Sequence, residues 1–431
     1  MRRGRGGPAP LVGEVQVPGD KSISHRALVL AALAEGTSSI AGLNLGHDVR
    51  ATASCIGLLG AGVRLNESNS HVEVHSPGAE GLHEPAVALD AGNSGTTIRL
   101  LLGVCAGIDG LTILSGDASL RARPMLRVVA PLRQMGARID GRAHGDRAPV
   151  AVRGGALEGV DLDLPVASAQ VKGALLVAGL RASGRTTVAE PGQSRDHTER
   201  MLRATGVSVT TEGAAVAVSG PARPRPRSWA VPGDISSAMF LIVAAALLPG
   251  SDLTVVGVGL NPTRTGALDV LAEMGADVRV EVEGEDGGEP FGSVRIRHSE
   301  LHAVPIHPDR IPGLIDELPA LAIAASRAEG QTVISGAAEL RVKESDRIAA
   351  MVDGLTLLGA DARALPDGMV ITGPCELAGG AVDSHGDHRV AMAFAVAGLV
   401  TSDAVRIKGW SSVDTSFPGF LDVLAKARGA R

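Results

Sequence analysis

The sequence predicts an α/β protein of two lobes, built from six repeated units with three units in each lobe. Six polar openings, each followed at once by an apolar block, begin at positions 20, 93, 168, 234, 316 and 387, about 70 residues apart. Amphipathic segments that end in a glycine and a short strand-like stretch lie between them. The lead-in Val-Pro-Gly-Asp occurs twice, from Val17 and from Val231, before closely matching apolar blocks.

The first opening, from Asp20, combines donors and cations with a helix that has no polar face. Lys21, Ser22 and Arg26 precede the block ALVLAALAEG. A helix that is apolar all round is buried. Its leading N–H groups and partial positive charge favour an anion, and buried cations need a negative partner. We therefore expect an anion-binding site at the start of this helix.

The other openings and the segments between them follow the same layout. The remaining openings are 93–99, 168–172, 234–237, 316–319 and 387–389. The amphipathic segments are 51–65, 127–139, 199–210, 267–280 and 349–364, and each contains a glycine where the helix should end. Glycine there supplies a left-handed cap that turns the chain into a strand. Each unit is predicted to run helix, strand, helix, strand.

The two Val-Pro-Gly-Asp segments predict where the chain crosses between lobes. We expect one lobe at 20–234 with repeats 1–3, and the other at 1–19 plus 235–431 with repeats 4–6, with the active site in the cleft between them. The loops PARPRPRSW (221–229) and EGEDGGEPFG (283–292) are predicted to be solvated connections, because loops of this composition bury little.

Composition excludes several classes of protein. With 45% hydrophobic and 20% charged residues the chain is typical of soluble globular proteins, and its apolar runs are too short to span a bilayer. A net charge of -6 and 2% aromatic residues argue against nucleic-acid binding. Cys55, Cys105 and Cys375 lack CxxC spacing, so neither disulfides nor zinc are expected. The opening MRRGRGGPAP has no apolar run after it and predicts a loose tail. We expect a cytoplasmic monomer without metal, cofactor or membrane contact.

Cations gather at the candidate site positions although the protein is net negative. They are Lys21, Arg26, Arg123, Arg195, Lys343, Arg347 and Arg389. Such a set suits ligands that carry phosphate and carboxylate groups. Asp316 and Glu344 would lie beside these cations, where general acid and base chemistry is a natural use. Ordinary structural roles stay open for Arg99 and Lys172 as surface residues, and for Ser22 and Ser168 as helix N-caps.

Seven motifs, in order, resemble one family. They are VPGDKSISHRALVLAALAEG, LDAGNSGTTIRLLLG, GDASLRARPM, SAQVKGALLVAGL, SRDHTERML, ELRVKESDRIAAM and GDHRVAMAFA. Together they resemble the 5-enolpyruvylshikimate-3-phosphate (EPSP) synthases, the 3-phosphoshikimate 1-carboxyvinyltransferases of the shikimate pathway, in their divergent second group. The resemblance runs from Val15 to Leu424. It implies a two-lobed inside-out α/β barrel and transfer of the carboxyvinyl group of phosphoenolpyruvate to the 5-hydroxyl of shikimate 3-phosphate, without a cofactor.

The resemblance also implies roles for individual residues. The catalytic residues would be Asp316, which takes the proton of the 5-hydroxyl with help from Lys21, and Glu344, which protonates the methylene carbon of phosphoenolpyruvate and later removes a proton from the methyl group. The residues implied for shikimate 3-phosphate are Lys21, Ser22, Arg26, Ser168, Ala169, Gln170, Arg195, Asp316 and Lys343. Those implied for phosphoenolpyruvate are Lys21, Gly95, Arg123, Gln170, Arg347 and Arg389.

Three positions depart from the best-known pattern of that family. Ala169 replaces a second serine, Thr415 replaces a phosphate-binding lysine, and Leu100 replaces a proline. Arg195 would compensate for the missing hydroxyl at Ala169. Because Gly95 is retained, the resemblance implies that the herbicide glyphosate competes with phosphoenolpyruvate, with a potency that Leu100 and Thr415 leave open.

The sequence argues against two alternative functions. The UDP-N-acetylglucosamine enolpyruvyltransferases share the fold and the donor, but they carry a reactive cysteine in a loop that reads SGDASLRARP here, without cysteine. A non-enzymatic anion-binding or nucleic-acid module would leave Asp316 and Glu344 without a role, and a nucleic-acid binder would also lack stacking aromatics.

Overall fold

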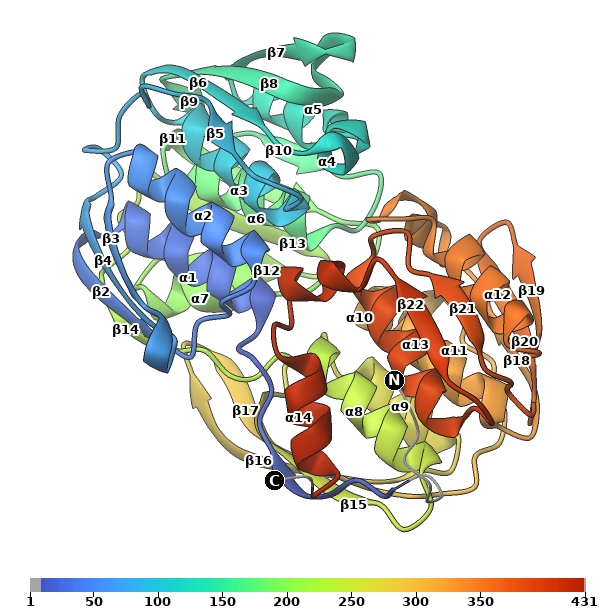
Figure 1. Ribbon diagram of the computed structural model, residues 1–431. Helices are drawn as coiled ribbons and strands as arrows, with labels where there is room; N and C mark the ends of the chain where they lie inside the picture. The colour runs from blue at the N-terminus through green and yellow to red at the C-terminus, as the bar shows by residue number, and fades with distance from the viewer. Residues whose placement is uncertain (1–8, 430–431) are drawn as a thin grey trace. The chain divides into compact units, whose positions relative to one another are not determined.

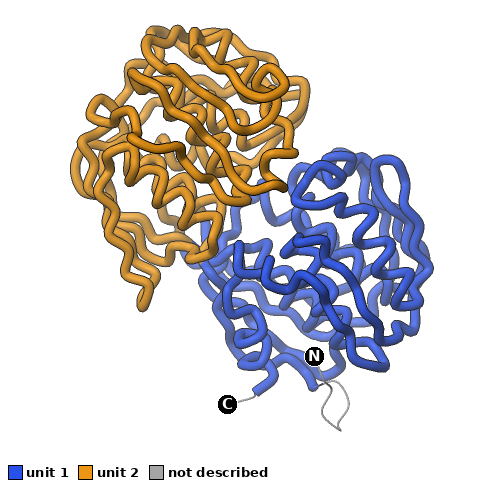
Figure 2. Tube along the Cα trace, turned by 45° about the horizontal axis from the view of Figure 1, so that its top comes forward, with its two compact units in different colours: residues 1–18, 232–284, 290–431 blue, residues 19–231, 285–289 orange. Residues whose placement is uncertain are grey.

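The computed structural model describes residues 9–429, which form two compact units (Figure 2). Unit 1 comprises residues 9–18, 232–284 and 290–429, and unit 2 comprises residues 19–231 and 285–289. The basic residues 1–8, for which the sequence predicts a loose tail, lie outside the described residues.

Unit 2 contains three successive repeats, each with a buried helix, a strand, a second helix and an antiparallel hairpin. The first has α1 (Lys21–Leu33), β2 (Glu35–Ala41), α2 (His47–Leu58), β3 (Gly62–Asn66), η1 (Glu67–Asn69) and β4 (His71–Pro77). The second has β5 (Leu89–Asp90), α3 (Gly95–Ala106), β6 (Gly110–Ser115), α4 (Ala118–Ala122), α5 (Leu126–Gln134), β7 (Arg138–Arg142), η2 (Ala143–Gly145) and β8 (Arg147–Gly154). The third has β9 (Leu157–Glu158), β10 (Asp161–Asp163), α6 (Ala169–Gly179), β11 (Ala182–Ala189), α7 (His197–Ala204), β12 (Val209–Glu212) and β13 (Ala215–Gly220), before β14 (Ser228–Ala230).

Unit 1 repeats the pattern with a shortened last copy. Its first repeat has β1 (Val12–Val15), α8 (Ile235–Leu247), β15 (Asp252–Gly259), α9 (Gly266–Glu273), β16 (Asp277–Asp286) and β17 (Glu289–Arg297). The second has η3 (Pro308–Arg310), α10 (Ile311–Leu314), α11 (Leu318–Arg327), β18 (Gly330–Ile334), η4 (Ala338–Val342), α12 (Arg347–Leu357), β19 (Asp361–Leu365) and β20 (Gly368–Gly373). The last has β21 (Gly380–Asp383), α13 (His388–Val400), β22 (Val405–Lys408), η5 (Trp410–Thr415) and α14 (Phe420–Ala427).

The two units exchange their first strands. β1 precedes α1 in the chain but pairs in parallel with β15, with Val12 opposite Asp252. β14 precedes α8 but pairs in parallel with β2, with Ser228 opposite Ser39. The sheets therefore run β1-β15-β17-β16 in unit 1 and β14-β2-β4-β3 in unit 2. Each exchange is made at one of the two Val-Pro-Gly-Asp segments.

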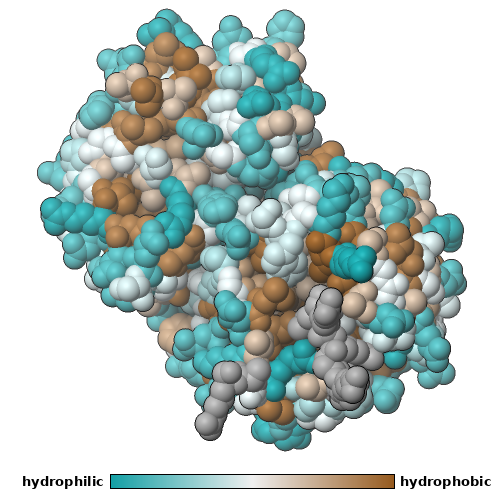
Figure 3. All heavy atoms as spheres, in the orientation of Figure 1, coloured by the Kyte–Doolittle hydropathy of each residue, from teal (hydrophilic) through white to brown (hydrophobic). Residues whose placement is uncertain are grey.

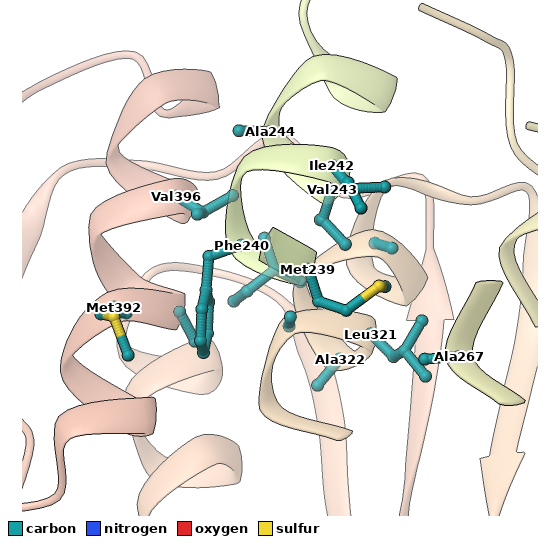
Figure 4. Close-up of a cluster of buried hydrophobic side chains, with 14 of the residues drawn as sticks. Met239, Phe240, Ile242, Val243, Ala244, Ala267, Leu321, Ala322, Met392 and Val396 are labelled. Carbon is teal, nitrogen blue, oxygen red and sulfur yellow. The ribbon is translucent and has the colours of Figure 1, made fainter. Parts of the chain in front are cut away.

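Helices fill the interior of each unit and sheets cover them. In unit 2, α1, α2 and α3 lie together, with β2, β3 and β4 along their outer side (Figure 1). In unit 1, Met239 and Phe240 of α8 lie between Leu321 of α11 and Met392 of α13 (Figure 4). Every residue of α8 from Ile235 to Ala246 is buried. A helix without a polar face is stable only in such an interior, so the predicted all-round burial is confirmed.

The helix ends follow the predicted signals. The side chains of Asp20, Ser94, Ser168, Asp234 and Asp387 each accept a hydrogen bond from the first turn of the helix that follows. The amphipathic helices are followed by Gly60, Gly136, Gly206, Gly275 and Gly359, with φ between 84° and 109°. The predicted left-handed glycine turns are therefore confirmed. α11 differs, because it begins after Glu317 without a side-chain cap.

Two loops that we expected to be solvated contain buried residues. Glu289, the first residue of β17, is 2% exposed, and its Oε1 lies 2.8 Å from Nδ1 of His197. Trp229 is also buried, with the guanidinium of Arg227 4.5 Å above its ring and Arg227 bonded to Asp286. The prediction of solvated connections was wrong for these residues, because tertiary partners compensate the polar groups that the loops bury.

On the face shown in Figure 3, hydrophilic residues alternate with separate hydrophobic patches. Among residues 9–429, no helix is both long and apolar enough to cross a membrane.

Candidate active site

The start of α1 places two cations in unit 2. Nζ of Lys21 lies 3.0 Å from Oδ2 of Asp48, at the start of α2. Arg26 is almost fully buried and donates to Thr198 Oγ1 at 2.7 Å, to the carbonyl of Ser22 at 3.0 Å and to the carbonyl of Ala169 at 3.1 Å. Because its three acceptors lie on three different segments, the guanidinium is held in one orientation.

The electrostatics of this end of unit 2 are dominated by burial. Burial lowers the pKa of Arg26 to about 10, and the nearby charge of Arg195 adds to that lowering, although Glu199 and Asp20 oppose it. Arg195 therefore lies close enough to Arg26 for their charges to repel. Arg26 is still a cation at neutral pH, and an anion bound beside the two arginines would relieve that repulsion.

Two arginines, Arg99 of α3 and Arg123 at the end of α4, lie near Gly95, the first residue of α3. Arg123 donates to Oδ1 of Asn93, and Arg99 donates to Oε1 of Gln170. A Cβ atom added at Gly95 would lie 2.9 Å from NH1 of Arg99 and 3.2 Å from NH1 of Arg123. Gly95 thus leaves room for both guanidinium groups at the helix N-terminus, where backbone N–H groups also favour an anion.

The start of α6 contributes the third part of the unit 2 set. Ser168 is the N-cap, and its own N–H donates to Oε1 of Glu190 at 2.6 Å. Gln170 Nε2 donates to Thr96 Oγ1 at 2.9 Å, which connects α6 to the first turn of α3. The alternative that Ser168 is an N-cap is confirmed, and the alternative that Arg99 and Lys172 are surface residues is wrong, since both are buried. Ser22 does not cap α1, because Asp20 does.

In unit 1 the predicted residues converge on one carboxylate. Asp316 lies just before α11, and three cations surround it: NH1 of Arg347 at 3.1 Å, Nζ of Lys343 at 3.6 Å and NH2 of Arg389 at 3.7 Å. Arg389 also donates to the carbonyl of Asp316 at 3.2 Å. These contacts fix the carboxylate, which is only partly exposed, between the starts of α11, α12 and α13.

Arg347 is the centre of this unit 1 set. It is 1% exposed, and it bonds to Glu344 Oε2 at 2.6 Å and Asp387 Oδ2 at 2.7 Å as well as to Asp316. Burial by itself would lower the pKa of Arg347, but the charges of Asp387, Glu344 and Asp316 outweigh it and raise the pKa above its usual value. Arg347 therefore stays charged and holds both predicted catalytic carboxylates, Asp316 and Glu344, on one guanidinium.

The structure brings the predicted residues into two sets, one in each unit. The unit 2 set is Lys21, Ser22, Arg26, Gly95, Arg123, Ser168, Ala169, Gln170 and Arg195. The unit 1 set is Asp316, Lys343, Glu344, Arg347 and Arg389. Among residues 9–429, no group of three or more His, Cys, Asp or Glu side chains is arranged to hold a metal ion.

Sequence reasoning missed three partners of these residues. Lys21 is bonded to Asp48, Arg26 to Thr198, and the N–H of Ser168 to Glu190. None of the three partners lies in one of the six openings that precede the apolar blocks, and Thr198 is 172 residues from Arg26. The sequence provided only weak evidence that Asp48 binds a cation, because acidic residues are common in first helical turns, where the helix dipole favours them. Thr415, where a family lysine was expected, donates to the carbonyl of Ser412 at 2.7 Å.

Comparison with known proteins identifies the family. A sequence model of EPSP synthase (3-phosphoshikimate 1-carboxyvinyltransferase) matches residues 6–424. The chain belongs to the EPSP synthase family. It is 57% identical to the 3-phosphoshikimate 1-carboxyvinyltransferase of Gloeobacter violaceus over 97% of both chains. It is 52% identical to that of Desulfitobacterium hafniense, over 96% of this chain and 94% of the relative.

A solved structure of the family agrees with the fold. The EPSP synthase of Acinetobacter baumannii superposes with a TM-score of 0.87 at 46% identity, over 98% of this chain and 96% of that one. The family and the two-lobed inside-out α/β fold predicted from the motifs are confirmed. The UDP-N-acetylglucosamine alternative is not favoured by these comparisons.

Proposed function

We propose that this chain transfers the carboxyvinyl group of phosphoenolpyruvate to the 5-hydroxyl of shikimate 3-phosphate and releases phosphate, a step of aromatic amino acid biosynthesis. Family membership over residues 6–424 carries this proposal. The side-chain geometry supports it, because one set offers cations and helix N-termini for anionic ligands, and the other offers two carboxylates held on one buried guanidinium.

In the proposed chemistry, Asp316 removes the proton of the 5-hydroxyl while the oxygen attacks C2 of phosphoenolpyruvate. Glu344, which enters the cycle in its protonated form, gives that proton to C3, and a tetrahedral ketal phosphate forms. Glu344 then removes a proton from the new methyl group, the C2–O bond to phosphate breaks, and phosphate leaves with the bonding electrons and takes the proton held by Asp316. Atoms and charges balance without a further reactant.

The cations stabilise the charge that moves in these steps. Arg347 and Arg389 would take the carboxylate of phosphoenolpyruvate, and Lys21, Arg123, Gly95 and Gln170 would surround its phosphate. A ligand carboxylate at Arg347 would compete with Glu344, and that competition would free Glu344 to work as acid and base. Fixed charges aimed at the reacting group lower the barrier without reorganising during the reaction.

Shikimate 3-phosphate would be held mainly by unit 2. Ser22 and Arg26 would contact its ring substituents and carboxylate. Ser168, Ala169, Gln170, Arg195 and Lys343 would surround the phosphate and hydroxyl groups. The contact between Arg26 and the carbonyl of Ala169 supports this grouping, because it joins the starts of α1 and α6.

The deciding experiment is an assay of phosphate release. The purified protein is incubated with phosphoenolpyruvate and either shikimate 3-phosphate or UDP-N-acetylglucosamine. We expect release only with shikimate 3-phosphate. Release with the nucleotide sugar would instead support the alternative transferase, and no release with either acceptor would refute the proposal.

A further inference from the structure

A buried cluster of three charges lies behind the start of α6. Nζ of Lys172 is 2.8 Å from Oε2 of Glu190 and 2.7 Å from Oε1 of Glu199, and the three side chains are 5%, 2% and 3% exposed. We call these residues the Lys172 cluster. Nothing in the proposed chemistry uses them, yet buried charges of this kind are costly unless they are paired.

The charges in the Lys172 cluster do not cancel. Two carboxylates face one ammonium, which leaves a formal charge of about −1 at neutral pH. Burial alone would lower the pKa of Lys172, but the charges of Glu199 and Glu190 outweigh it, so the pKa is raised and Lys172 stays a cation. Oε2 of Glu199 has no hydrogen-bond partner among the described residues.

The cluster is bonded directly to residues that we assign to shikimate 3-phosphate. Oε1 of Glu190 accepts the N–H of Ser168 at 2.6 Å, so a carboxylate occupies one donor at the N-terminus of α6. Glu199 is in α7 next to Thr198, which accepts from Nε of Arg26 at 2.7 Å. The cluster therefore joins the start of α6 to the residue that fixes Arg26.

This arrangement creates an electrostatic problem for a phosphate. Two anions at one helix N-terminus repel each other, and in a buried setting that repulsion is weakly screened. A cation beside the internal carboxylate reduces the repulsion while the carboxylate keeps its bond to Ser168. Lys172 is in that position.

We propose, resting on the proposed function, that Lys172 is a positioning residue that sets the affinity for the 3-phosphate of shikimate 3-phosphate. Through Glu190 it fixes the Ser168 end of α6, and through its charge it offsets the two buried glutamates beneath the phosphate site. The affinity for shikimate 3-phosphate then follows the net charge of the cluster, and the affinity for phosphoenolpyruvate changes less.

Three variants separate charge from shape. Lys172→Gln makes the cluster more negative by one unit. Glu199→Gln makes it less negative by one unit and is nearly isosteric, since the amide NH₂ can take the position of the unpartnered Oε2. The double variant restores the original net charge. A cavity of about 370 Å³ lined by Lys172, Glu190 and Glu199 leaves room for these changes.

The measurement is the KM for each substrate in the phosphate-release assay. We expect KM for shikimate 3-phosphate to rise about tenfold in Lys172→Gln, to stay level or fall in Glu199→Gln, and to return towards the wild-type value in the double variant. Leu175→Ala, a buried apolar truncation on the same helix α6, is the control for lost stability and should leave KM unchanged.

Changes of opposite sign in KM for shikimate 3-phosphate in the two single variants would support the inference, because a purely structural role would weaken binding in both. A higher KM for shikimate 3-phosphate in Glu199→Gln, or equal changes for both substrates in Lys172→Gln, would overturn it. If Lys172→Gln does not fold, the inference is tested with the other two variants. KM for shikimate 3-phosphate should then stay level or fall in Glu199→Gln and lie near the wild-type value in the double variant. Wild-type turnover tests the proposed function separately.

Discussion

At the scale of single residues, Asp316 is held for chemistry by its surroundings. It contacts three cations just before α11, a helix that begins after Glu317 without a side-chain cap from that residue. We expect Asp316→Asn to lower kcat about 10²- to 10⁴-fold while both KM values stay close to wild type, because a general base acts in the transition state. Steady-state phosphate release measures both parameters.

The matched control for that substitution is Asp383→Asn in the same unit. Asp383 is bonded to Lys408, which is 81% exposed, and its loss should leave kcat unchanged. A wild-type kcat in Asp316→Asn would contradict the assigned role.

Gly95 is the second residue whose surroundings predict a result. In Gly95→Ala, the added Cβ would meet the ends of Arg99 and Arg123 at 2.9 Å and 3.2 Å. Both side chains can move, so we expect the free energy of unfolding to change by less than about 1 kcal/mol, and KM for phosphoenolpyruvate to rise about tenfold. Denaturant unfolding measures the free energy of unfolding, and steady-state kinetics on the same preparation measure KM for phosphoenolpyruvate.

Gly103→Ala gives the contrasting control on the same helix. Its Cβ would lie 2.2 Å from the backbone carbonyl oxygen of Ala174, where α3 packs on α6. Backbone cannot move aside as a side chain can, so this variant should lose stability. An unchanged KM for phosphoenolpyruvate in Gly95→Ala would argue against a ligand between the two arginines.

At the scale of elements, helix α1 predicts how stability depends on pH. His25 is fully buried, with its Nδ1 2.7 Å from Thr52 Oγ1. Burial, followed by the charges of Lys21 and Arg26, lowers the pKa of His25 well below 6.5. Below about pH 6.5 the unfolded chain therefore binds a proton that the folded chain does not. As the pH is lowered further, His25 alone decreases the free energy of unfolding by up to about 1.4 kcal/mol per pH unit.

Denaturant unfolding of wild type and His25→Gln at pH 7.5 and 5.5 tests this dependence. Glutamine keeps a hydrogen-bonding group but does not titrate, so the variant should lose less stability than wild type between the two pH values. Equal losses in the two proteins would show that His25 does not contribute.

At the scale of the whole molecule, the two sets of residues are chemically incomplete by themselves. The acid and base candidates are in unit 1, and most residues assigned to shikimate 3-phosphate are in unit 2. If one ligand pair is bound by both sets, saturating amounts of the two substrates should reduce the radius of gyration measured by small-angle X-ray scattering. A profile that does not change with both substrates would count against closure of the units around the ligands.

Inorganic phosphate alone is the control for that scattering experiment. It can occupy one anion site but cannot connect the two sets, so it should leave the radius of gyration unchanged.

Local signals in the sequence determined much of this protein. The apolar blocks after Asp20 and Asp234 had to become buried helices, because a helix formed from them has no polar face that could be exposed to solvent. Gly206 and Gly359 had to turn the chain, because their positions need positive φ. The repeated openings placed Lys21, Arg26 and Arg389 in the first two turns of buried helices, and the order of the motifs identified the family.

Only the tertiary structure decided which side chains meet. Arg26 and Thr198, Ser168 and Glu190, and His197 and Glu289 are bonded although 172, 22 and 92 residues separate them. Periodicity describes one element at a time, and it carries no information about which distant carboxylate will compensate a buried cation. That choice is made by packing, since a buried charge is stable only where the fold brings its partner within bonding distance.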